Sequence, residues 1–386
     1  MPFLKMDFEA YDNSESIAKH LEDLFASISR PIQFTTRCLL VHGSFQTPKN
    51  KRQKLNYNVQ IGWTIILSTF VFAAMAAAIC TMPPAYYCIY LSGCIDFFFL
   101  LYWTRSNRGM EYSKRLKKSS IGVGSLKKIK LIVQTRNVSV AVASVCSLVA
   151  FTLLALDMTG VIQLLPKNSI SVPKCCFHLL ALLLVLFCSP AAVSTVFCYI
   201  GSASAEFENI DRDFKHDTNK QQLPVARHYI RGHGQLLKLF EAVSKPVSAW
   251  CSAHITLNFI AAYKIICFIY EFDYEVSRLV ILWKPAALCF MLVAMLLQTT
   301  CIFCMALALR QRILGMRAAM IRVAAGDRLP HEQIFSLFSL HLLDLQQHLS
   351  GISFFGLTVI DRHFLNACFI VGSVTAVYCY QRYNRP

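Results

Sequence analysis

The sequence predicts an all-α polytopic membrane protein with seven transmembrane helices, a cytoplasmic amino terminus and an extracellular carboxyl terminus. Three observations predict this fold class. Hydrophobic residues make up 55% of the 386 residues and charged residues only 16%, whereas soluble globular chains hold about 25% charged residues. Several stretches near bilayer length contain no Asp, Glu, Lys or Arg. The basic residues fall almost entirely on alternate loops between those stretches.

Each transmembrane helix is predicted from a charge-free window, because a bilayer core about 30 Å thick requires about 20 apolar residues. The first window, Leu55–Ile95, has 41 residues and is divided by Pro83 and Pro84, which favours two helices over one. A large soluble helical core is the alternative, and so many uninterrupted stretches of this length disfavour it. The predicted spans are residues 59–80, 86–104, 138–158, 175–200, 248–270, 283–308 and 356–380.

The spans divide the chain into an amino-terminal segment (1–58), a seven-helix domain (59–380) and a short tail (381–386). The amino-terminal segment is polar and does not read as a cleavable signal peptide. Within it, Ser14–Ile28 has the apolar spacing of an amphipathic helix, which lies either on a surface or beneath the bundle.

The distribution of Lys and Arg predicts the orientation, because these residues accumulate on the cytoplasmic side of membrane helices. The amino-terminal segment and the loops after the second, fourth and sixth spans hold 30 of them, and the opposite side holds six. The amino terminus is therefore expected inside the cell, and with seven spans the carboxyl terminus lies outside. A rhodopsin-like receptor has its amino terminus outside, so the charge asymmetry disfavours that class.

Apolar stripes continue past the predicted spans on the inner side. His233–Trp250 has apolar residues on one helical face, Arg310–Ala325 follows the sixth span without a helix breaker, and Ile334–Leu349 repeats the pattern. We expect these helices to project below the membrane and to assemble there as a packed platform.

The sequence offers no support for an enzyme, a cofactor, a metal site or nucleic-acid binding. P-loop, HExxH, GxSxG and GxGxxG motifs are absent. Cys301 and Cys304 form a CxxC pattern without a second pair, which is typical of small core residues within a helix. The net charge of +16 is explained by the inner loops, and the lack of an internal repeat gives no support to an inverted-repeat transporter.

Ionisable and aromatic side chains within the spans are candidates for a ligand site. Asp96 and Lys264 lie at membrane depth, where such groups are costly and often functional; they pair, or either faces a wet cavity, or Lys264 reaches the interface. Aromatic residues near the outer ends form either a headgroup belt or a small-molecule pocket. The candidate pocket residues are Tyr87, Tyr90, His178, Lys264, Tyr270 and Trp283.

The last span carries the most specific pattern. Residues 351–366 read GISFFGLTVIDRHFLN, an apolar stretch follows, and Gln381-Arg382 stands close to the terminus. This segment resembles the carboxyl end of arthropod gustatory receptors, in which a G-x-F-x-I-D type segment leads into a final helix ending in Thr-Tyr, five apolar residues and Gln-Phe. Here Val374 and Thr375 stand at the Thr-Tyr positions and Arg382 replaces the Phe. The chain is thus identified as a divergent member of the insect chemoreceptor superfamily, over about 30 residues of motif and most of the architecture.

The resemblance implies a ligand-gated, non-selective cation channel of the plasma membrane, assembled as a homo- or heterotetramer, with a tastant bound between helices toward the outer face. The final helix would line the pore. A ring of Arg382 guanidinium groups near the outer mouth would repel cations and so weaken the preference for them. Val374, Val377, Tyr378 and Gln381 recur at i, i+3, i+4 and i+7 and so share one face; ordinary helix packing is the competing interpretation. A G-protein-coupled receptor, a secondary transporter and a light-sensing relative are the alternative functions.

Overall fold

The structure, a computed structural model, describes seven helices and one small sheet. It describes residues 51–81, 84–105, 172–217, 222–270, 278–324, 332–347 and 351–383, with isolated positions between 134 and 152. The all-α prediction is confirmed. The predicted helix at Ser14–Ile28 and most of the third span lie outside the described residues. The elements are α2 (Lys51–Thr81), α3 (Pro84–Arg105), α6 (Val172–His216), α7 (Leu223–Tyr270), α8 (Arg278–Ala324), α9 (Glu332–Gln347), β1 (Ser353–Phe354), β2 (Thr358–Val359) and α10 (Arg362–Tyr383).

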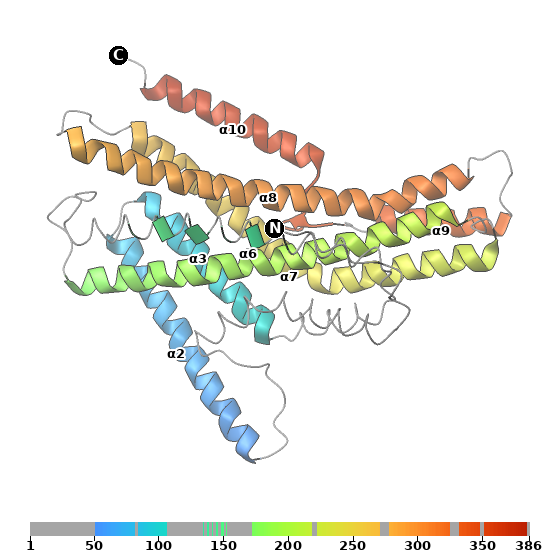
Figure 1. The fold of residues 1–386 in the computed structure, drawn as a ribbon, viewed down its shortest axis with the longest axis horizontal. Helices are drawn as coiled ribbons and strands as arrows, with labels where there is room; N and C mark the ends of the chain where they lie inside the picture. Colours follow the sequence, from blue (N-terminus) through green and yellow to red (C-terminus); the bar gives the residue numbers. More distant parts are fainter. Residues whose placement is uncertain are drawn as a thin grey trace, which may run out of the picture.

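Three long helices form the body of the molecule. α6, α7 and α8 have 45, 48 and 47 residues, so each is about 70 Å long, roughly twice the thickness of a bilayer core. Figure 1 shows them side by side along the long axis, with α9 at one end. α3 packs against α6 and α7, and α2 packs against α3 and α6. α2 begins at Lys51, before the expected 59, because no helix breaker separates its polar first turns from the apolar stretch.

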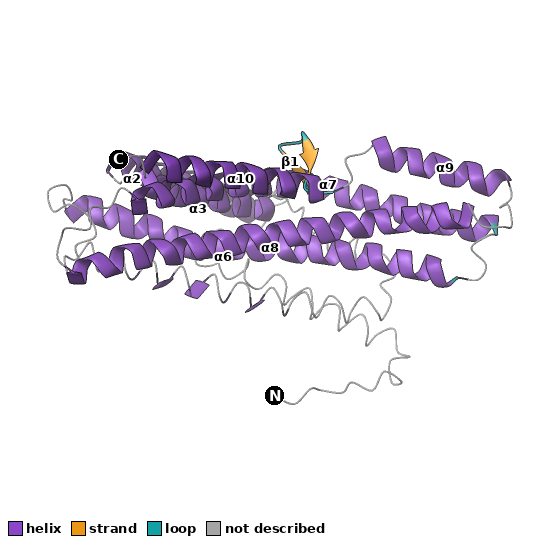
Figure 2. Cartoon of the chain, turned by 90° about the horizontal axis from the view of Figure 1, so that it is seen from above, coloured by secondary structure: helices purple, strands orange, loops and turns teal. Residues whose placement is uncertain are grey.

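Two stretches of the described helices are long and apolar enough to cross a membrane by length and composition, Asn58–Ala77 and Phe187–His216. They differ in their surroundings, since 11% of the first and 89% of the second is buried inside the molecule. The apolar side chains of α2, such as Ile66 and Phe72, are therefore exposed, whereas α6 is the centre of the bundle. Figure 2, seen at right angles, shows α10 level with α2 and α3, whereas Figure 1 shows it beyond α8, away from α2.

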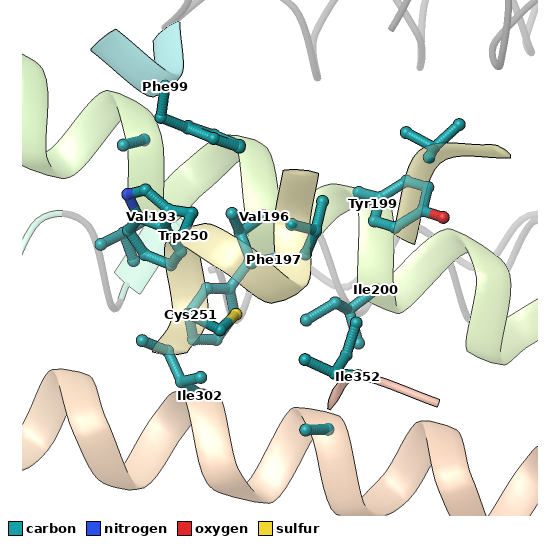
Figure 3. Close-up of a cluster of buried hydrophobic side chains, with 14 of the residues drawn as sticks. Phe99, Val193, Val196, Phe197, Tyr199, Ile200, Trp250, Cys251, Ile302 and Ile352 are labelled. Carbon is teal, nitrogen blue, oxygen red and sulfur yellow. The ribbon is translucent and has the colours of Figure 1, made fainter. Parts of the chain in front are cut away.

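The core lies where α3, α6, α7 and α8 meet. Figure 3 shows its side chains arriving from all four helices and from the segment before β1. Aromatic rings run through it: Trp250 packs 5.5 Å from Phe99, and Tyr199 stacks on Phe240 at 5.8 Å, centroid to centroid. The Tyr199 hydroxyl also donates to the Phe240 carbonyl at 2.8 Å, which fixes α6 against α7.

The final helix begins later than the sequence predicts. Residues 356–361 were expected to be helical, but Thr358–Val359 pairs with Ser353–Phe354 as an antiparallel hairpin and α10 starts at Arg362. Local chemistry explains the difference. Gly356 has φ +72°, which favours a turn over a helix, and Asp361 caps α10 by accepting the Phe364 N–H at 3.0 Å.

The ends of α6, α7 and α8 beyond the predicted spans form a second packed region with α9, which we call the distal bundle (residues 206–216, 223–245, 310–324 and 332–347). Its core includes Phe214, Met316, Met320 and Phe338, all buried. His233 of α7 and His341 of α9 are also buried, and His233 Nδ1 lies 3.1 Å from His341 Nε2. The apolar stripes predicted this packing, and the histidine pair adds a polar contact between α7 and α9.

The distal bundle should lose stability in acid through His233. Burial, and to a smaller extent the neighbouring His341, lowers the pKa of His233 from 6.5 to about 3. Between these values the unfolded chain binds a proton that the folded chain does not, so the free energy of unfolding falls as pH falls below 6.5. The expected slope from this group is at most about 1.4 kcal/mol per pH unit. Thermal unfolding of the detergent-solubilised protein between pH 7.5 and 5 measures it.

His233→Asn is the matched variant, because an amide can occupy the position of Nδ1 without titrating. We expect its unfolding free energy to depend less steeply on pH than that of the parent protein. Equal slopes in the two proteins would show that His233 is not the group responsible.

Candidate functional site

A buried polar cluster lies at the centre of the bundle, where three helices meet. Its members are Ser92 and Asp96 of α3, Trp250, His254 and Asn258 of α7, and Gln298 and Thr299 of α8. Trp250, His254 and Asn258 follow one another at four-residue intervals, which places them on one face of α7. The cluster therefore joins α7 to its neighbours on both sides.

Asp96 lies at the centre of this cluster and is fully buried. The Trp250 Nε1–H donates to Asp96 Oδ1 at 2.7 Å, and His254 Nδ1 lies 3.6 Å from the same oxygen. The second carboxylate oxygen, Oδ2, has no hydrogen-bond partner among the described residues. Burying a carboxyl group costs free energy unless it is hydrogen-bonded, so the Trp250 N–H is the group that makes this position tolerable for Asp96.

The hydrogen bonds of His254 assign its tautomer. His254 Nε2 lies 3.2 Å from Gln298 Oε1, and an amide oxygen only accepts, so we assign a proton to Nε2. His254 Nδ1 lies 3.1 Å from Ser92 Oγ and can accept from that hydroxyl. The imidazole thus bridges α3 and α8, and it also stacks on the Trp250 ring at 4.7 Å.

A second contact ties α7 to α8 one turn further along. The Asn258 Nδ2–H donates to Thr299 Oγ1 at 3.0 Å, and both side chains are buried. Within the described residues no group of three or more His, Cys, Asp or Glu could hold a metal ion. The hydrogen bonds of the cluster form directional contacts between α3, α7 and α8.

The predicted pocket residues lie in different parts of the structure. Tyr87 is half-buried and Tyr90 is buried on α3, one turn apart and close in sequence to Asp96. Lys264 is exposed on α7, with its Nζ 5.9 Å from the centroid of the Tyr263 ring. The structure does not bring Lys264 to Asp96, whose neighbours are Trp250 and His254. The side chains of His178, Tyr270 and Trp283 lie outside the described residues, although their backbones belong to α6, α7 and α8.

Sequence reasoning missed most of the polar cluster. The polar residues of the α7 segment WCSAHITLN carry no formal charge, so they fell inside a charge-free window. The signal that was available is their spacing, with Trp, His and Asn at i, i+4 and i+8 in an otherwise apolar helix.

The four predicted pore residues lie on α10 and are exposed. Val374 is 63% exposed, Val377 and Tyr378 are each 56% exposed, and Gln381 is exposed as well. α10 continues to Tyr383, so Gln381 belongs to the helix rather than to a tail.

The arrangement matches solved structures of one kind. The structure of the insect olfactory receptor OR5 from Machilis hrabei in complex with eugenol has a TM-score of 0.64 over 94% of this chain and 99% of that chain, at 13% identity. The structure of the same receptor described without eugenol matches with a TM-score of 0.63 over 95% and 99% of the two chains, at 12% identity. The chain has the fold of the insect olfactory receptors. The predicted seven-helix fold is confirmed, since this fold has seven transmembrane helices.

Sequence comparisons give no closer relative. No protein-family model matches the chain, and no curated protein matches it in sequence. The likeness to the olfactory receptors is therefore one of fold alone. The resemblance of the carboxyl-terminal segment to gustatory receptors is a separate observation.

Trp250→Phe should destabilise the insect-receptor fold of this chain, because it leaves the buried Asp96 Oδ1 without its donor. The expected loss is about 1–3 kcal/mol in unfolding free energy, seen as a lower melting temperature of the protein in detergent. Trp103→Phe is the matched control, since Trp103 is a buried indole that packs by ring contacts with Phe99 and Tyr199.

Adding Asp96→Leu to Trp250→Phe should recover part of the lost stability, because no carboxylate then remains buried. If the Trp250→Phe and Trp103→Phe proteins had the same melting temperature, the Trp250 indole N–H would not be the group that stabilises buried Asp96.

Proposed function

We propose that the chain is a chemosensory receptor of the gustatory type, a multi-pass membrane protein in which a small ligand opens a cation-permeable pore lined by α10. The observation that carries this proposal is the exposure of the apolar side chains of α10. Its first turns pack on the core through Phe364, Leu365 and Cys368, and beyond them its apolar side chains are exposed. A helix that is largely uncovered in one chain needs lipid, partner subunits or both to cover it.

Four copies of α10 around an axis account for the pattern of its residues. The valines at 374 and 377 and Tyr378 would form an apolar constriction, and Gln381 would form a polar ring beside it. The opposite side of α10 would face its own bundle and the lipid. The fold and the resemblance of residues 351–382 support membership of the insect chemoreceptor superfamily. The four subunits of the proposed channel are copies of this chain or include other subunits.

The ligand site in this proposal lies between helices toward the outer face. The related fold was solved with eugenol bound in the Machilis hrabei receptor, which supports a small-molecule ligand here. Of the candidate residues, Tyr87 and Tyr90 extend the polar cluster along α3, so a ligand touching them would act next to Asp96. Lys264 is exposed in the structure, and we place it at the lipid headgroups rather than in the pocket.

The orientation in this proposal follows from the basic residues, with the amino terminus in the cytoplasm and the receptor in the plasma membrane. The distal bundle then lies inside the cell. The α8 segment in this bundle, residues 310–324, carries four Arg and no acidic residue, as expected for the cytoplasmic side, and one of them, Arg312, pairs with Glu208 of α6 at 2.9 Å.

Whole-cell recording tests the proposed channel. Cells expressing the chain should carry a cation current in response to at least one compound of a panel of sugars, amino acids and small phenols that includes eugenol. Gln381→Ala should change the permeability ratio of Na⁺ to Ca²⁺ by about twofold or more, because a ring of polar side chains at a constriction sets ion selectivity.

Cys379→Ser is the matched control, because residue 379 falls about 140° around α10 from Val374. It should leave the permeability ratio unchanged. Unchanged permeation in a conducting Gln381→Ala channel would contradict the pore assignment. An amino-terminal tag that is accessible in intact cells would favour a G-protein-coupled receptor, and ligand-driven flux without unitary current steps would favour a transporter.

A further inference from the structure

The segment between α9 and α10 is a compact hairpin seated on the bundle. Ser353 pairs with Val359 and Phe354 with Thr358. The Ile360 N–H donates to the Ile352 carbonyl at 2.9 Å and closes the base of the hairpin, while the Leu357 N–H donates to the Phe354 carbonyl at 3.0 Å at its turn. Phe355 and Gly356 adopt φ values of +50° and +72° to make that turn.

The base of the hairpin is held by burial. Ile352 and Ile360 are fully buried, and Figure 3 shows Ile352 among the core side chains, beside Ile200 of α6. Gly351, at φ +148°, admits the close approach of Val359, whose Cγ1 would lie 2.8 Å from an added Cβ. The base of the hairpin is therefore part of the core, whereas its turn, with Phe355 and Leu357, is exposed.

The outer edge of β1 is held by two serine hydroxyls of α7. The Ser353 N–H donates to Ser248 Oγ at 3.0 Å, and the Phe355 N–H donates to Ser252 Oγ at 2.8 Å. The Ser252 hydroxyl donates to the Ser248 carbonyl at 2.7 Å and also lies 3.3 Å from the Ser353 carbonyl. An edge strand normally leaves such backbone groups unpaired, so Ser248 and Ser252 stand where a third strand would otherwise lie.

The same turns of α7 carry the buried polar cluster on the other side. Residues two apart in a helix point about 200° away from each other. Ser248 and Ser252 thus face the hairpin, while Trp250 and His254 face Asp96, Ser92 and Gln298. A shift of α7 relative to α3 cannot leave the hairpin contacts unaffected, because one rigid helical segment makes both.

The hairpin determines where α10 begins. One residue, Ile360, separates β2 from the Asp361 cap, and the Phe354 ring packs 4.8 Å from the Phe364 ring in the first turn of α10. The hairpin is thus joined covalently to the start of α10 and packed against α7.

We propose that Ser248 and Ser252 form a latch that fixes the start of α10 against α7, and that the making and breaking of this latch sets the equilibrium between the closed and open pore. The proposal rests on the proposed function, because it assumes that α10 lines the pore. Ser248 and Ser252 act as positioning residues, because their hydroxyls contact the hairpin and α7 itself. Their loss should change how readily the pore opens without changing which ions pass.

Ser252→Ala is the test, because it leaves the Phe355 N–H without its acceptor. We expect the concentration for half-maximal current, or the current without any compound, to change at least about threefold, as for residues that modulate coupling between sites. The Na⁺ to Ca²⁺ permeability ratio should not change. The probe is the panel of sugars, amino acids and phenols including eugenol, applied to cells with matched surface expression.

Ser244→Ala is the matched control, because Ser244 lies one to two turns earlier on the same face of α7 and its hydroxyl donates to the Glu241 carbonyl at 3.1 Å, within its own helix. It should behave like the parent protein. Ser252→Thr retains the hydroxyl and should restore most of the parent response, which a loss of packing alone would not predict. If Ser252→Ala does not reach the surface, Ser248→Ala removes one latch bond and is recorded in its place.

Hydrogen exchange on the detergent-solubilised protein separates the latch from the channel. The amides of residues 353 and 355 should exchange faster in Ser252→Ala than in Ser244→Ala. A parent protein without any evoked current would overturn the proposed function and, with it, the gating role of the latch. A gated parent in which Ser252→Ala responds like Ser244→Ala would overturn the gating role alone, and equal exchange would overturn the latch itself.

Discussion

The rest of the structure depends on one buried carboxylate. Asp96 lies at the centre of the bundle with no exposed surface, and its stability there requires the Trp250 indole to remain within reach, while the His254 imidazole on the same face of α7 contacts Ser92 of α3. That requirement fixes the register of α3 against α7. Because His254 also reaches Gln298, it fixes α8 as well. The directional contacts of Asp96 and His254 add to the close packing of the aromatic rings in holding these helices in register.

In this register, α7 contacts both the polar cluster and the hairpin. One face of its residues 248–254 holds the polar cluster, and the other holds the hairpin from which α10 starts. Among the described side chains of α10, those that pack on the core, Phe364, Leu365 and Cys368, belong to its first turns. A helix attached in this way can change its tilt with little disturbance to the bundle, which is the property that a pore-lining helix needs.

The sequence predicted the parts of the fold that depend on composition along the chain. Charge-free windows placed the apolar portions of α2, α3, α6, α7 and α8, and apolar stripes predicted the extensions that form the distal bundle. The predicted start of α10 was wrong because a hairpin of two-residue strands has no periodicity to detect. The turn of this hairpin also depends on Phe355 and Gly356, which adopt positive φ. The hairpin is also the first part of the segment that carries the resemblance to gustatory receptors, residues 351–382.

The candidate site was harder to predict, because its members are brought together only by tertiary packing. Asp96 was singled out from its charge in an apolar window, but Lys264, the other charge in a span, was the wrong partner to consider. The partners that the structure shows are uncharged or weakly basic, and nothing in the spacing of Ser92, His254 and Gln298 indicates that they meet. The same holds for His233 and His341, which lie on different helices of the distal bundle.

The most direct measurement is the structure of the purified protein by electron cryomicroscopy in a lipid nanodisc. We expect four chains around one axis, with the four copies of α10 nearest that axis, Val374, Val377 and Gln381 lining it, and each hairpin seated on Ser248 and Ser252. A monomer, or an assembly in which α10 faces the lipid at the outer rim, would contradict the proposed central pore.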